Sequence, residues 1–101
     1  MESSKEVVVL LHGILGSTLI MKVLEKFFKK NGYEVLNIGY PSIRHNLEFL
    51  ADYVWTKVSK KIDGYKKVHF VCHSMGGLVT RVMLNKYKLK NLGRIVFMGT
   101  P

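Results

Sequence analysis

The sequence predicts an α/β protein: a mostly parallel four-stranded sheet between layers of helices. Four short apolar runs alternate with three segments of helical periodicity over the 101 residues, and no linker separates them. The first run, residues 7–11 (VVVLL), is apolar throughout, as expected for a parallel strand that is covered on both faces. Right-handed crossovers between such strands put helices on both sides of the sheet, which gives a three-layer α/β/α sandwich.

The first helix is expected to begin at Ser17, a residue type that caps helix N-termini, and to end near Asn31-Gly32. Its expected core face consists of apolar residues at helical spacing, namely Ile20, Leu24, Phe27 and Phe28. The second strand is predicted over residues 33–40, and Pro41 ends it.

The second half repeats the pattern twice. A helix is expected over residues 46–61, with one apolar face made of Leu47, Leu50, Val54 and Val58. The third strand is expected at 68–72 and the third helix at about 75–87. Residues 91–93 (NLG) are predicted as a turn before a fourth strand at 95–98.

Length and composition predict a single small domain, residues 1–101, and exclude a disordered chain, because 48% of the residues are hydrophobic. The lone cysteine, Cys72, excludes an internal disulfide and favours a reducing compartment. The N-terminus carries two acids before a short apolar run, unlike a signal peptide. No stretch approaches the ~18 apolar residues of a membrane span. We therefore expect a cytoplasmic protein without a transmembrane segment.

The formal net charge of +9 raises the question of nucleic-acid or membrane partners. The lysines are dispersed, and most fall late in a helical pattern, where cations complement the helix dipole. Neither an arginine-rich stripe nor an aromatic platform for single strands is present. Nucleic acid is not expected as a partner, while a basic surface for anionic partners stays open as an alternative.

The most informative segment is residues 72–77 (CHSMGG), which follows an apolar run and opens a helical pattern. A serine at such a strand-to-helix turn has the setting of a nucleophile elbow. Other Gly, His and Ser clusters also stand at expected strand ends: His12-Gly13, Tyr40-Pro41 and Gly99-Thr100. Because ligands of open α/β sheets bind at the carboxyl ends of strands, these clusters predict one functional edge.

These segments resemble the α/β-hydrolase superfamily, and within it bacterial lipase- and esterase-like proteins. The resemblance rests on residues 7–16 (VVVLLHGILG), 33–41 (YEVLNIGYP), 68–81 (VHFVCHSMGGLVTR) and 93–101 (GRIVFMGTP). It implies the strand order 2-1-3-4 and a serine hydrolase of carboxylic esters, lipid-like esters among them, with no cofactor and no metal. A non-hydrolytic acyltransferase uses the same elbow, so the resemblance leaves that choice open.

The resemblance also implies roles for individual residues. Ser74 would be the nucleophile, and the backbone N–H groups of Ile14 and Met75 would hold the developing oxyanion. The supporting motif residues are His12, Gly13, His73, Gly76 and Gly77. The sharp turn requires small residues two before and two after the serine. Gly76 meets this requirement, whereas Cys72 departs from the family's usual glycine.

The triad acid and base are not found where the family places them, because residues 75–101 contain no Asp, Glu or His. Among the four histidines, His12, His69 and His73 are interpreted as structural, and His45 is the one candidate for an improvised base. Three interpretations follow. The chain is a truncated α/β-hydrolase fold, it works with a separate C-terminal fragment that supplies Asp and His, or it is a silent remnant. Under the order 2-1-3-4, truncation makes the fourth strand an edge, and we expect it to be prone to pairing or aggregation if the chain is expressed alone.

Other functions receive less support from the sequence. A non-catalytic α/β binding or partner domain with a basic surface is the main alternative. Cys72 lacks a second cysteine or metal-ligand spacing, so packing is its expected role. Residues 13–18 (GILGST) lack both the P-loop lysine and the G-x-G-x-x-G spacing. A flavodoxin-like domain is the best fold alternative, because it shares the 2-1-3-4 order.

Overall fold

A parallel sheet in the order β2-β1-β3-β4 forms the centre of the protein in a computed structural model, which confirms the predicted class and strand order. The structure describes residues 5–12, 18–41 and 45–99. The elements in chain order are β1 (Glu6–Leu11), α1 (Thr18–Lys30), β2 (Glu34–Ile38), α2 (Leu47–Ser59), β3 (Lys67–His73), α3 (Met75–Lys86) and β4 (Leu92–Met98).

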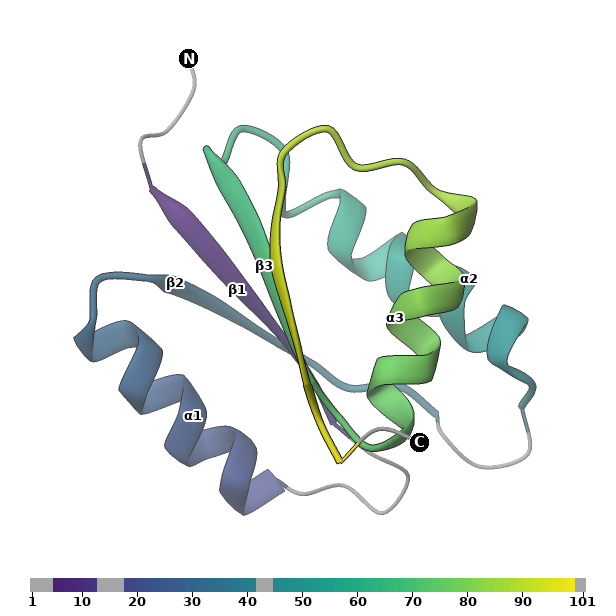
Figure 1. Ribbon diagram of the computed structural model, residues 1–101, viewed down its shortest axis with the longest axis horizontal. Helices are drawn as coiled ribbons and strands as arrows, with labels where there is room; N and C mark the ends of the chain where they lie inside the picture. The colour runs from purple at the N-terminus through teal and green to yellow at the C-terminus, as the bar shows by residue number, and fades with distance from the viewer. Residues whose placement is uncertain (1–4, 13–17, 42–44, 100–101) are drawn as a thin grey trace.

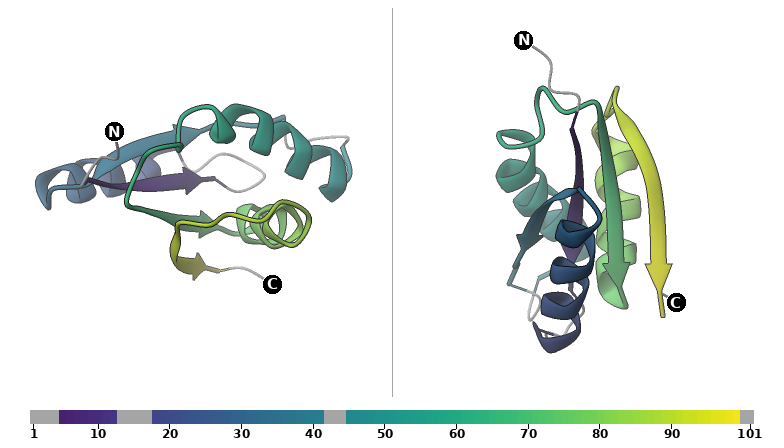
Figure 2. Two further views of the ribbon diagram at one scale, coloured as in Figure 1. Left: turned by 90° about the horizontal axis from the view of Figure 1, so that it is seen from above. Right: turned by 90° about the vertical axis from the view of Figure 1, so that its left-hand side faces the viewer.

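The helices lie on both sides of the sheet, with α1 on one face and α2 and α3 on the other (Figures 1 and 2). The larger hydrophobic core lies between the sheet and the α2/α3 pair, where Leu50, Val54 and Met83 are fully buried. Asn46 caps α2 by accepting the N–H of Phe49 at 2.8 Å. Within the part of the chain that is described, no helix is long and apolar enough to cross a membrane.

The core face predicted for the first helix is partly wrong. Met21 is the fully buried residue of α1, and Leu24 and Phe28 pack beside it. Ile20 and Phe27 are 39% and 56% exposed, so they lie on a side of α1 that no described element covers. Helical periodicity predicted the helix correctly but assigned too many of its residues to the buried face. A helix that packs on a sheet buries only the residues that meet the sheet.

The predicted turn at residues 91–93 is also corrected, because β4 begins at Leu92 and includes Gly93. The register between β3 and β4 shifts between Val68 and Phe70. A Cβ on Gly93 would lie 2.3 Å from Nδ1 of His69, so the glycine leaves room for the imidazole. The next amide, the N–H of Arg94, donates to the same Nδ1 at 2.8 Å. Gly93 therefore serves a close approach within the strand.

All four strands run in the same direction, and the carboxyl ends of β1, β3 and β4 meet at the lower edge of the sheet in Figure 1. This edge carries His12 after β1, Tyr40 after β2 and Ser74 between β3 and α3. The fold thus brings together residues that are 28 to 62 positions apart in sequence. Because β1 pairs with β3, the end of β1 lies beside Ser74.

Candidate active site

Ser74 occupies the sharp turn between β3 and α3 and has the unusual backbone angles φ 54° and ψ −123°. Among the described residues it is the one non-glycine residue with a positive φ. A side chain in this region costs about 1–3 kcal/mol, and such strain concentrates at functional sites. The Ser74 N–H donates to the carbonyl of Met98 at 2.8 Å, and the Gly77 N–H donates to the Ser74 carbonyl at 3.1 Å. The turn is therefore held from both sides.

The Ser74 side chain does not cap α3, although serine is a preferred residue at a helix N-cap. Met75 is the first residue of α3, so its amide lies at the positive end of the helix dipole. An anion placed beside Ser74 would meet this helix N-terminus.

Gly76 allows α3 to approach β1. A Cβ at this position would lie 2.6 Å from the carbonyl oxygen of Leu11 and 2.8 Å from that of His12. Both neighbours are backbone atoms at the end of a central strand, so they cannot move aside as a flexible side chain could. The absence of a side chain at Gly76 therefore lets the serine turn lie close to the end of β1.

Cys72 lies two residues before Ser74 and is completely buried. Its Sγ is 3.1 Å from Oγ1 of Thr80, and Thr80 Oγ1 donates to the carbonyl of Gly76 at 2.9 Å. Burial raises the pKa of the Cys72 thiol to about 11, so at neutral pH the thiolate that reacts with electrophiles is scarce. The Cys72 thiol therefore packs beside the serine turn, and the Thr80 hydroxyl contacts both this thiol and the Gly76 carbonyl.

His12 is fixed against Tyr40 at the ends of the two neighbouring strands β1 and β2. The two rings stack with their centroids 4.6 Å apart, and the Tyr40 N–H donates to Nε2 of His12 at 3.4 Å. The Tyr40 hydroxyl donates to the His12 carbonyl. Burial raises the pKa of Tyr40 to about 12, so the phenol stays protonated and keeps this hydrogen bond at physiological pH. The pair stiffens the strand end that faces Gly76.

The other histidines lie in different surroundings. His69 is held by Oε1 of Glu6 at 2.6 Å from Nε2 and by the Arg94 N–H on Nδ1. It precedes Ser74 by five residues, about 16 Å along an extended strand. His45 is exposed and stacks on Phe49 with centroids 4.3 Å apart. His73 ends β3 opposite Met98 and is half-buried.

The expected site is described in part. Gly13 and Ile14, the latter expected to donate an oxyanion hydrogen bond, lie outside the described residues. The described part of the expected edge brings together Ser74, Met75, Gly76 and His12. It also includes Tyr40, one of the strand-end residues predicted for this edge, which bonds to His12. Thr80, one helical turn beyond Gly76, is a residue that the sequence did not single out.

Comparisons with known proteins agree with this geometry. Residues 1–99 match the family described as "Putative serine esterase (DUF676)", and the chain belongs to this family. Lysosomal thioesterase PPT2-B of Xenopus laevis is 29% identical over 105 residues, which cover 93% of this chain and 35% of that protein.

A solved structure supports the fold. The crystal structure of MGS-MChE2, an α/β-hydrolase enzyme from the metagenome of sediments of the Mar Chica lagoon in Morocco, superposes with a TM-score of 0.78 at 23% identity. The match covers 99% of this chain and 47% of that one. The chain therefore spans about a third of the curated relative and about half of the solved structure, and it shares the fold of an α/β-hydrolase enzyme.

Proposed function

We propose that this chain carries the nucleophile half of a serine esterase or thioesterase, with Ser74 as the nucleophile. The observation that carries the proposal is the backbone of Ser74, φ 54° at a strand-to-helix turn, with Gly76 against the end of β1. In a nucleophile elbow, a turn of this kind presents the serine hydroxyl above the sheet edge, beside a helix N-terminus. Membership of a serine esterase family and a thioesterase among its relatives support the same chemistry.

In the proposed reaction Ser74 Oγ attacks the carbonyl carbon of an acyl ester or thioester, and a base takes the hydroxyl proton. The N–H groups of Met75 and Ile14 would hold the oxyanion, and loss of one such donor typically costs about 10²–10³ in rate. The alcohol or thiol leaves with a proton, and water then hydrolyses the acyl-enzyme. Tyr40 and His12 would act by holding the strand end beside this turn.

The triad acid and base are proposed to come from a segment outside these 101 residues, as in a longer hydrolase or a separate C-terminal fragment. No Asp, Glu or His follows Ser74 in the sequence. His69 is too far along β3 to serve, and both of its ring nitrogens are engaged. A triad that lacks its base can still show weak catalysis from the oxyanion hole, so weak turnover alone does not demonstrate a complete site.

The deciding experiment is labelling with a serine-directed fluorophosphonate probe. The probe is expected to label the wild-type chain, and the Ser74→Ala variant is expected to lose the label. Ser59→Ala is the matched control, because Ser59 is a half-buried serine at the end of α2 and should leave labelling unchanged. Equal labelling of Ser74→Ala would overturn the assignment. A folded wild-type chain without label would favour the alternative, a non-catalytic binding domain with a basic surface.

The cytoplasm is the compartment we propose, because Cys72, the one cysteine of these 101 residues, is buried and forms no disulfide. The curated relative is named a lysosomal protein, so the lysosome is the compartment to compare with the cytoplasm. Fractionation of cells that express the complete gene distinguishes them, and recovery outside the cytoplasm would refute this part of the proposal.

A further inference from the structure

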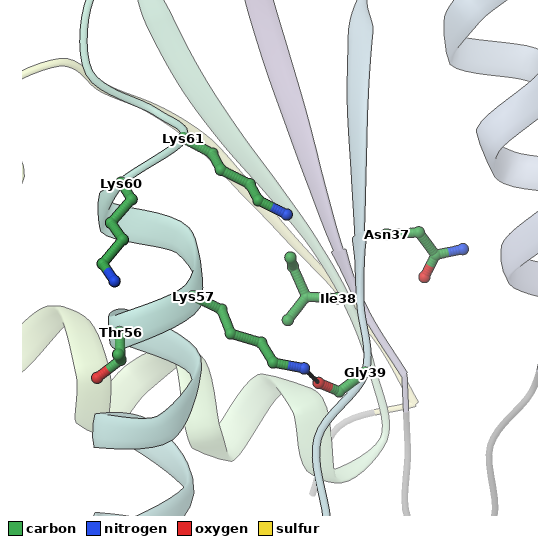
Figure 3. Close-up of a pocket in the computed structure, with 7 residues that line it drawn as sticks. All are labelled: Asn37, Ile38, Gly39, Thr56, Lys57, Lys60 and Lys61. Atoms are coloured by element: carbon green, nitrogen blue, oxygen red, sulfur yellow. Dashed lines mark hydrogen bonds between the residues drawn. The ribbon is translucent and has the colours of Figure 1, made fainter.

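A basic groove lies along the free edge of the sheet, between β2 and the end of α2. Lys57, Lys60 and Lys61 line it, and its floor is the buried side chain of Ile38 together with Gly39 (Figure 3). Its volume is about 350 Å³, within the range of small-molecule sites. Lys57 and Lys61 extend toward β2 in Figure 3, whereas Lys60 lies along the helix.

The groove carries three lysines, Lys57, Lys60 and Lys61, and in the described part of the chain none of them forms an ion pair with a carboxylate. Ion pairs among the described residues use other lysines, namely Lys5, Lys29 and Lys86. Asp63, two residues after Lys61, lines a different hollow together with Lys88 and Lys90. Asp52 shares a hollow with Lys57, but its carboxylate is engaged by Lys86 and the Tyr87 hydroxyl. The C-terminal end of α2 contributes about half a negative charge, which three ammonium groups outweigh. An anion in the groove would therefore meet a net positive field.

One lysine is already held in place. Lys57 Nζ donates to the carbonyl of Gly39 at 3.3 Å and lies 4.8 Å from the centre of the Tyr53 ring. An ammonium group has three donors, so Lys57 keeps capacity for a further acceptor. This contact reduces the side-chain entropy that would be lost when Lys57 binds a ligand.

A chain of contacts links the groove to the candidate active site. Gly39, whose carbonyl accepts from Lys57, is followed by Tyr40, and Tyr40 is bonded to His12. The backbone of His12 in turn faces Gly76 of the serine turn. A ligand that lies along the end of β2 could thus place an anionic group among the lysines and another part near Ser74.

We propose that this groove is a binding site for a phosphate group. Its role as a subsite for a phosphate-bearing ester or thioester rests on the proposed function, but binding of the phosphate group does not. A phosphate could be carried by a soluble substrate or by a lipid headgroup, and both present the same oxygens to lysine donors. The competing explanation is that the lysines only protect the exposed edge of β2 from pairing with other strands.

The test is a titration of the ¹⁵N-labelled full chain with sodium phosphate, at an ionic strength matched with sodium chloride. Saturable shifts are expected for the amides of Ile38, Gly39 and Lys57. In the Lys57→Gln/Lys61→Gln variant, loss of two charge-assisted contacts should weaken phosphate binding about tenfold or more. Lys61→Gln alone should weaken binding to a smaller extent, which covers the case in which the double variant folds poorly.

Lys88→Gln/Lys90→Gln is the matched control, because it removes the same charge from a different hollow and should leave the phosphate affinity unchanged. Shifts that chloride reproduces, or equal weakening in the control, would overturn the proposal. The titration is repeated with Ser74→Ala, which should bind phosphate as the wild type does. A failure of the esterase assignment would thus be seen in the labelling experiment and not in this one.

The source of the phosphate is distinguished with vesicles. Lysine-dependent sedimentation with phosphatidylglycerol vesicles, but not with phosphatidylcholine vesicles, would support a lipid headgroup. Phosphate binding without sedimentation would support a soluble phosphate ester.

Discussion

The two faces of the sheet differ in how completely they are covered. On the face of α2 and α3, Leu50, Val54 and Met83 are fully buried. On the face of α1, Val23 and Phe27 are 59% and 56% exposed. Four strands about 4.8 Å apart span roughly 14 Å, whereas a helix is about 10 Å across, so two helices can close a face and one cannot.

This difference shows where the site is supported. The serine turn continues into α3, and Gly76 and Thr80 connect it to β1 and to Cys72 within the closed face. The open face also includes Val96 of the edge strand β4, which is 49% exposed. The strain at Ser74 is thus held by the better packed half of the molecule.

The largest expected effect compares a buried residue of α2 with an exposed apolar residue of α1. Leu50→Ala should lower the free energy of unfolding by about 3–4 kcal/mol, because it opens a cavity under α2. Phe27→Ala should cost less than about 1 kcal/mol, since more than half of its side chain is already in water. Urea denaturation of both variants measures the contrast. Equal losses would show that the face of α1 is covered in solution.

The next effect tests the contact between the serine turn and β1. Gly76→Ala should destabilise the fold by about 2–3 kcal/mol, because the new Cβ would overlap backbone oxygens. It should also reduce fluorophosphonate labelling of Ser74. Gly39→Ala is the control, since the nearest atom to its Cβ would be 3.8 Å away, at Nε2 of His12. A stable Gly76→Ala variant with normal labelling would contradict the proposed support.

The smallest effect concerns the side of α1 that borders β2. Its ion pair between Glu25 and Lys29, with a second hydrogen bond from Asn37, lowers the pKa of the Glu25 carboxyl below 4.5. Because the pKa of Glu25 is lower in the folded state than in the unfolded state, the ionised carboxylate stabilises the fold at pH values above the unfolded-state pKa. This stabilisation is lost as the pH falls through the folded-state pKa. Glu25→Gln should therefore cost about 0.3–0.5 kcal/mol at pH 7.

The difference between Glu25→Gln and wild type should disappear in acid, which denaturation curves measured from pH 7 down to pH 3 would show. A difference that grew as the pH fell would contradict the assignment of this ion pair.

The sequence predicted the strands and the serine turn because their signals are local. Residues 7–11 are apolar without interruption, and residues 72–77 join a strand pattern to a helix pattern. The strand order came from the resemblance, since periodicity does not say which strands are neighbours. The buried face of α1 and the start of β4 were predicted incorrectly. The burial of Ile20 and Phe27 and the conformation at Gly93 depend on contacts with elements distant in sequence, which periodicity does not report.

By itself the sequence determined the α/β class, the alternation of elements and the position of Ser74, because hydrophobic period and turn residues act over a few neighbours. Only the tertiary structure decided which face is closed, that Gly76 meets the end of β1, and that Tyr40 holds His12. It also decided that Lys57 and Lys61 share a groove with Gly39. These features depend on segments that are far apart in the chain. Their distances from one another are fixed only when the strands and helices pack closely together.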